Sequence, residues 1–239
     1  GGDISGQHNG TISTDGYKTV GVLLQTAGGG GGVIDGTFRG SAGGQGNSGK
    51  INFKMNGTID AQGTNPVGIF AQSVAGSKKQ GVINIQVQDS GQQGDINLEL
   101  TKNHSINTNM TGIGVQFSGG NQNTLINNGQ VIAASPAGYG MTVVGGNANE
   151  RIISTNGAQM IGNINLGSGI NSINNNFGSL FKTAGTIYVG PTKASSFTNA
   201  GILRTTQQRP LNIELTGSFT QATSGEMDFN LDFSDYKID

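Results

Sequence analysis

The chain has 239 residues, with 43 glycines, 4 prolines, no cysteine, 33% hydrophobic residues and a formal net charge of -1. Collagen is excluded because it requires glycine at every third position and abundant proline, and disordered chains usually combine lower hydrophobicity with higher net charge. The 13 Lys and Arg against 14 Asp and Glu provide no electrostatic footprint for nucleic acid or an anionic membrane, so we expect neither partner.

The lack of cysteine removes disulfides, thiolate metal sites and cysteine nucleophiles, and it suits export in an unfolded state. No apolar run approaches the roughly 20 residues of a transmembrane helix, so we expect no direct membrane insertion of this fragment. The first residues, Gly-Gly-Asp-Ile, lack the basic and apolar regions of a signal peptide, which indicates a processed or truncated piece.

The first predicted element is an Asn-Gly-x-Ile turn and strand followed by a strand that begins with glycine. Residues 9–14 read NGTIST and residues 21–26 read GVLLQT, and their apolar anchors, Ile12 and Val22, lie ten residues apart. The glycines of residues 28–32 then predict a tight corner or a flexible excursion, before a short apolar strand at residues 33–34.

A glycine-rich motif comes next. Residues 44–49, GQGNSG, match the dinucleotide-binding fingerprint by letters alone, and Gly44 to Lys50 nearly match a phosphate-binding loop. Both motifs require a following helix, but residues 50–53, KINF, alternate as a strand, and Ile51 stands where the phosphate loop needs Ser or Thr. We therefore predict a glycine corner here and no nucleotide site.

The same arrangement of two segments recurs further along the chain. Residues 56–61 lead to residues 68–73 with anchors Ile59 and Ile69, and residues 128–133 lead to residues 140–146 with anchors Val131 and Met141, again ten apart. A looser copy runs from residues 104–108 to residues 112–117. The copies begin at residues 9, 56, 104 and 128, and so 47, 48 and 24 residues apart, which predicts two, two and one turns of a coil of about 24 residues.

The remaining segments support a fold made of strands. Alternating apolar residues at 51–53, 82–87, 95–100 and 186–189 predict strands with one buried face, and no window of ten or more residues has convincing helical spacing. Short strands joined by Gly and Asn corners at a fixed period form the rungs of a β-solenoid, in which stacked rungs share one core. We predict an all-β, single-stranded solenoid, a right-handed parallel β-helix of roughly ten rungs.

This fold makes two predictions about individual residues. Ile12, Ile59 and Val131 should point into the shared core. Asn and Gln at matching corners, as in residues 121–123 and 174–176, can form hydrogen-bonded ladders along the solenoid axis, but each run taken alone is better explained as a solvated loop.

The sequence changes character near its end, where residues 210–221 and 225–233 alternate more regularly than the upstream strands. We predict β-helix rungs over residues 1–209. Residues 210–239 should form C-terminal rungs or the start of a stabilising cap region within the same continuous solenoid.

These features resemble the passenger domains of classical autotransporters, which are exported by type V secretion. The Asn-Gly-x-Ile repeats, the rung at residues 68–73, the glycines of residues 28–32 and the segment 215–221 with its following acidic strand carry the resemblance. It implies a right-handed β-helix at the bacterial cell surface or released from it, and a parent chain that continues into an outer-membrane β-barrel. It also implies adhesion, self-association or host-cell binding, with a host receptor, matrix, glycan or sibling passenger as partner.

Two alternatives remain. One is a secreted effector that binds a host receptor, and the other is a polysaccharide lyase or glycoside hydrolase, because β-helices often carry such sites on an outer face. Hydrolysis needs two carboxylates about 5 to 9.5 Å apart, and a lyase needs clustered acids, often with calcium. The acids before residue 210 are scattered instead: Asp15, Asp35, Asp60, Asp89, Asp95, Glu99 and Glu150. Asp15 with Asp60, or Asp95 with Glu99, can still meet on one face after coiling.

The densest acidic group lies near the end of the sequence and consists of Glu226, Asp228, Asp232 and Asp235. Calcium binding is one interpretation, but alternating outward acids on a solvated strand explain the pattern. The two histidines, His8 and His104, are isolated and are predicted at corners. We therefore predict a non-catalytic protein with no catalytic, cofactor-binding or metal site and no cofactor.

Overall fold

The computed structural model describes residues 1–29, 32–34, 37–39, 46–76, 78–88, 95–100, 112–135, 138–205 and 212–228. The strands at 32–34, 37–39 and 95–100, and Ser135 at the end of another strand, are described without their side chains. Within these residues all regular elements are strands, apart from turns, so the predicted all-β class is confirmed. This part of the chain contains no apolar helix long enough to cross a lipid bilayer.

Most strands belong to three parallel sheets, which we name in the order in which the chain reaches them. The first sheet contains, in spatial order, β1 (Ile4–His8), β6 (Ile51–Met55), β9 (Ile83–Val87), β12 (Gln122–Asn127), β16 (Asn149–Ser154), β19 (Ser172–Asn175), β22 (Ser196–Asn199) and β25 (Ser218–Gln221). The second contains β2 (Thr11–Thr14), β7 (Thr58–Gly63), β10 (Asp95–Leu100), β13 (Gln130–Ser135), β17 (Gln159–Ile161), β20 (Leu180–Thr183), β23 (Ile202–Thr205) and β26 (Glu226–Asp228).

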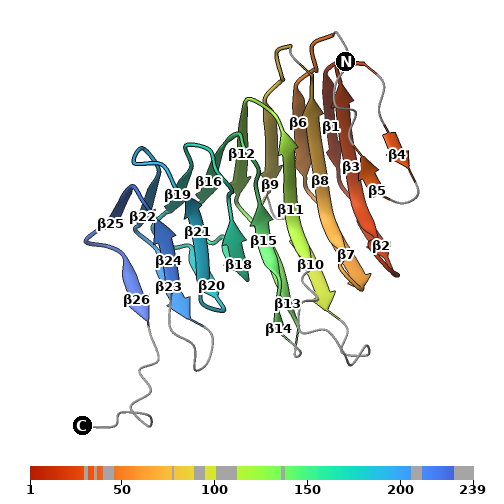
Figure 1. The fold of residues 1–239 in the computed structure, drawn as a ribbon. Helices are drawn as coiled ribbons and strands as arrows, with labels where there is room; N and C mark the ends of the chain where they lie inside the picture. Colours follow the sequence, from red (N-terminus) through yellow and green to blue (C-terminus); the bar gives the residue numbers. More distant parts are fainter. Residues whose placement is uncertain are drawn as a thin grey trace, which may run out of the picture.

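The third sheet contains β3 (Val20–Ala27), β8 (Val67–Val74), β11 (Ile113–Gly119), β15 (Met141–Val144), β18 (Asn163–Asn165), β21 (Thr186–Gly190) and β24 (Asn212–Leu215). Two antiparallel pairings add β14 (Gly138–Tyr139) beside β13, and join β4 (Gly32–Ile34) to β5 (Thr37–Arg39). The chain visits the three sheets in turn and then returns beside its previous strand in each, so the stack grows from the N-terminal to the C-terminal end (Figure 1). Parallel sheets in this order are compatible with a β-solenoid.

The sheets hold 8, 9 and 7 strands, so the predicted count of roughly ten rungs is not confirmed. The prediction that a 47-residue spacing equals two turns is wrong, because Ile12 pairs directly with Ile59. Later returns are shorter: Ile152 pairs with Ile173, 21 residues on, and Ile173 pairs with Phe197, 24 residues on. The first return is long because the chain between β3 and β6 leaves the three sheets, and β4 and β5 pair only with each other.

The repeats align in part as predicted. Val22 pairs with Ile69, which confirms the alignment of the first two copies. In the next strands, however, Ile69 faces Val115, and Val115 faces Val143, so the predicted alignment of Ile69 with Met141 is wrong by two residues. A shift of two keeps the same side chains on the inner face, because the side-chain period of a strand is two.

Alternate side chains of the three sheets form one apolar core. Ile59 and Val131 are fully buried, and Ile12 packs partly buried against the same cluster, which confirms their predicted inward direction. One column of this core follows the middle of the first sheet in direct register: Phe53, Ile85, Leu125, Ile152, Ile173 and Phe197. Burying each such side chain contributes roughly 1.5 to 3 kcal/mol, so stacking is the main source of stability.

Glycine stacks on glycine where neighbouring turns meet at corners. A Cβ added to Gly57 would overlap the main-chain oxygen of Gly10, and one added to Gly140 would overlap that of Gly112. At Gly63 the backbone also has a φ of 104°, which a residue with a side chain rarely adopts. The glycine-rich composition thus follows from the close approach of successive backbones.

A hydrogen-bonded amide ladder connects the C-terminal ends of successive strands in the first sheet. Asn175 Nδ2 donates to Asn199 Oδ1 at 2.8 Å, and Asn199 Nδ2 donates to Gln221 Oε1 at 3.0 Å. The interpretation of residues 174–176 as a solvated loop is therefore wrong for Asn175, which is buried and belongs to a ladder. Asn123, in the other predicted run, donates to Glu150 Oε1 at 3.2 Å instead.

Candidate functional site

Polar side chains cover the outer surface of the first sheet because each strand alternates. In β6, Ile51, Phe53 and Met55 are buried, whereas Asn52 and Lys54 are exposed. The same alternation in β9 places Asn84 outside. Strand pairing therefore sets the outward side chains of successive strands beside one another.

Two rows result. The Asn52 row consists of Ser5, Asn52, Asn84 and Thr124, and the Lys54 row consists of Gln7, Lys54, Gln86 and Ile126. Together with Gly6, Phe53 and Ile85, these residues line a hollow of ≈ 470 Å³ over β1, β6, β9 and β12. Neighbouring strands lie about 4.8 Å apart, so both rows present one side chain at each such step along the stack.

Two side chains of the hollow hold each other in place through a hydrogen bond. Asn84 Nδ2 donates a 2.8 Å hydrogen bond to Asn52 Oδ1, which fixes the two amides beside each other. The Lys54 ammonium is exposed, and in the part of the chain that the structure describes the single ion pair joins Arg204 to Asp228. Lys54 can therefore bind an anion from outside.

Both rows continue along the first sheet. The Asn52 row extends through Arg151, Ser172, Ser196 and Ser218, and the Lys54 row extends through Ile153, Asn174, Thr198 and Thr220. We call these sixteen positions the polar face. Its charged members, Lys54 and Arg151, are both cations, and it contains no acidic residue.

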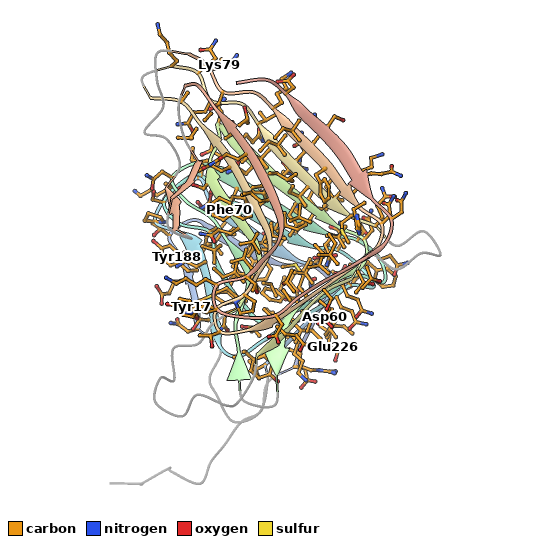
Figure 2. The ribbon with its side chains drawn as sticks, turned by 90° about the vertical axis from the view of Figure 1, so that its right-hand side faces the viewer. Tyr17, Asp60, Phe70, Lys79, Tyr188 and Glu226 are labelled. Carbon is orange, nitrogen blue, oxygen red and sulfur yellow. The ribbon has the colours of Figure 1, made fainter. Side chains whose placement is uncertain are left out.

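The acids weighed as catalytic candidates are placed elsewhere. Asp60 lies on the outer surface of the second sheet, accepts a hydrogen bond from Gln62 Nε2 at 3.3 Å, and stands opposite Ser13 rather than Asp15. Asp95 and Glu99 pair with Thr58 and Gln62, but their side chains are outside the described residues, as are Asp35 and Asp89. Figure 2, seen from the β1–β3 end, shows Asp60 and Glu226 on the side of the second sheet, away from Phe70 and Tyr188 of the third sheet, although β7 and β26 lie near opposite ends of the second sheet.

The C-terminal acids are only partly described. Glu226 and Asp228 lie on β26, and Asp228 Oδ2 accepts from Arg204 Nε at 2.8 Å, which gives this acid a structural partner. Asp232 and Asp235 lie outside the described residues. Among the residues that are described, no three Asp, Glu or His side chains are grouped so that they could hold a metal ion.

The other motifs weighed in the sequence are simple to place. The residues after the glycine motif form strand β6, as predicted, while Gly44 itself is outside the described ranges. His8 is the last residue of β1, next to the corner rather than in it, and His104 is outside the described ranges.

The structure reveals one unusual acid that sequence reasoning did not single out. Glu150 is 1% exposed and lies in the inner column of the first sheet, between Asn123 and the corner that precedes β19. Burial raises its pKa to about 7, although its Oε1 accepts from Gly146 N and Asn123 Nδ2. Its Oε2 is buried with no hydrogen-bond partner in the described structure.

We expect this acid to make stability depend on pH. The folded-state pKa of about 7 exceeds the ordinary 4.5, so the folded state holds the Glu150 proton more tightly than the unfolded state does. The contribution of this proton to the free energy of unfolding is complete below pH 4.5 and is lost as pH rises through 7. The free energy of unfolding should fall by up to about 3 kcal/mol over this range. Urea titrations of the wild type, Glu150→Gln and the exposed control Glu226→Gln from pH 4 to 9 measure it. The Glu150→Gln variant should lose most of this dependence; an unchanged pH profile would contradict the assignment.

Comparison with protein-family models, curated proteins and solved structures finds no match for this chain.

Proposed function

We propose that the chain is a single right-handed parallel β-helix from an autotransporter-type passenger, located outside the bacterial cell, that binds surfaces without catalysis. The order of the strands supports the solenoid, because seven successive sets contribute one strand to each sheet and β25 with β26 begins another set. Strands β24, β25 and β26 extend the same three sheets, in keeping with a continuous solenoid through this part of residues 210–239.

The polar face is the observation that carries the function. It presents amides and hydroxyls at regular steps, and most of these groups can both donate and accept hydrogen bonds. Such a surface suits many weak contacts with cell-surface or matrix molecules, whose combined strength comes from avidity rather than from one deep pocket. The lining of the hollow contains no acidic residue, whereas glycoside hydrolysis would require a carboxylate pair.

We expect the purified protein to bind host cells or extracellular matrix saturably. A triple variant, Asn52→Ala with Lys54→Ala and Asn84→Ala, should lower binding at least about tenfold, because it removes the central amides and the cation. Lys182→Ala, on the outer surface of the second sheet, is the matched control and should bind as the wild type does. Flow cytometry with labelled protein measures both.

The same preparation separates the alternatives. Incubation with pectin, glucans and host glycans should produce no new reducing ends and no unsaturated products. Turnover would establish the enzyme instead. Equal binding by the triple variant and the wild type would remove the polar face from the proposal.

A further inference from the structure

We propose that the hollow over β1, β6, β9 and β12 binds a linear, uronate-containing polysaccharide that lies along the stacking axis, across the strands. This inference rests on the proposed adhesive function and names the ligand of the same surface. Four features of the hollow support it: its periodicity, its hydrogen-bonding groups, its charge and its position on the sheet.

The periodicity favours a ligand that repeats. Ser5, Asn52, Asn84 and Thr124 occupy one register position on four adjacent strands. The spacing of about 4.8 Å between strands is close to the advance of one sugar ring in an extended chain. A polysaccharide lying across the strands therefore meets an equivalent polar side chain at each residue.

The hydrogen-bonding groups match sugar hydroxyls. The Asn84–Asn52 bond uses one amide hydrogen and one carbonyl oxygen, and it leaves the Asn52 amide nitrogen and the Asn84 carbonyl oxygen with no partner in the described structure. The pair thus presents a donor and an acceptor side by side in a fixed arrangement. A sugar hydroxyl both donates and accepts, so vicinal hydroxyls can bind both groups.

The charge selects an acidic sugar. Lys54 is flanked in its row by Gln7 and Gln86, and none of the residues that line the hollow is acidic. An ammonium with no acidic neighbour in the hollow favours a carboxylate on the ligand. A single cation in the hollow is too little for a nucleic acid, whose binding depends on neutralising several phosphates.

The position of the hollow argues against a peptide. Extended peptides bind by adding a strand to a sheet edge, but the hollow lies on the face of four paired strands. Peptide hot spots also need desolvated pockets for aromatic or Arg anchors, whereas seven of the eleven residues that line this open hollow are Asn, Gln, Ser, Thr or Gly. Ile126, the partly exposed member of the Lys54 row on β12, is suited to packing against the C–H face of a sugar ring.

The test compares polygalacturonate, alginate and hyaluronate fragments of two to twelve sugars, with methyl-esterified polygalacturonate as an uncharged match. Isothermal titration at fixed ionic strength should show affinity that rises with length until the four strands are covered. The free acid should bind about tenfold more tightly than the ester. Lys54→Gln should reduce binding of the acid to the level of the ester and leave binding of the ester unchanged. Asn52→Ala with Asn84→Ala should weaken both ligands.

Lys182→Gln on the second sheet is the control and should leave both affinities unchanged. The proposal is overturned if none of the three acidic polysaccharides binds, if affinity does not depend on length, or if Lys182→Gln weakens binding as much as Lys54→Gln. Cell binding without polysaccharide binding would reject this ligand and retain the adhesive function. Polysaccharide binding without cell binding would retain this ligand and reject the adhesive function.

Discussion

Gly57→Ala is expected to destabilise the protein by at least about 3 kcal/mol, which is a large part of the free energy of unfolding of a typical domain. The added Cβ would overlap the main-chain oxygen of Gly10 in the preceding turn, and its three nearest atoms are all backbone atoms of Gly10, so no flexible side chain can move aside. Gly146→Ala is the matched control, because no atom lies within 4 Å of a Cβ placed there. Thermal melts followed by circular dichroism measure both variants. Equal melting temperatures would show that neighbouring backbones do not approach closely at this corner.

Phe197→Ala is expected to cost about 3 to 5 kcal/mol through lost apolar burial and the cavity left behind. Phe197 is fully buried, and its ring lies 6.3 Å from that of Phe181 and 5.2 Å, edge-on, from that of Phe219. The control Ser196→Ala changes the neighbouring outward side chain and should alter stability by less than about 0.5 kcal/mol. Guanidinium titrations distinguish the two, and a small effect of Phe197→Ala would contradict a continuous core at this level.

The fold class could be predicted because strand alternation and self-similarity are local signals. Ile12 and Ile59 carry the same motif, and they do lie side by side. The number of turns between them could not be predicted, since spacing alone does not distinguish two short turns from one turn with an excursion. The strand pairing, of Ile4 with Ile51 and of Ile12 with Ile59, shows that a single return takes 47 residues.

Neither the register nor the site could be predicted from the sequence, because both depend on which residues pair across the sheet. Alternation within residues 51–55 predicts that Asn52 and Lys54 point outward, but it does not predict which residues lie beside them. Those neighbours are Asn84 and Gln86, each 32 residues further along the chain, and only the strand pairing identifies them. Glu150 illustrates the opposite difficulty. It precedes Arg151 in the sequence, and charge alone does not tell which of the two faces inward; the pairing of Glu150 with buried Asn123 decides it.

The unequal lengths of the returns have a consequence for how such a chain can change. Residues 4 and 51 are as directly paired as residues 152 and 173, although 47 residues separate the first pair and 21 the second. Because each turn contacts only its neighbours, segments at the corner after β3 can be gained or lost without altering the pairing above and below. That corner is therefore a natural place to graft a foreign epitope or reporter peptide.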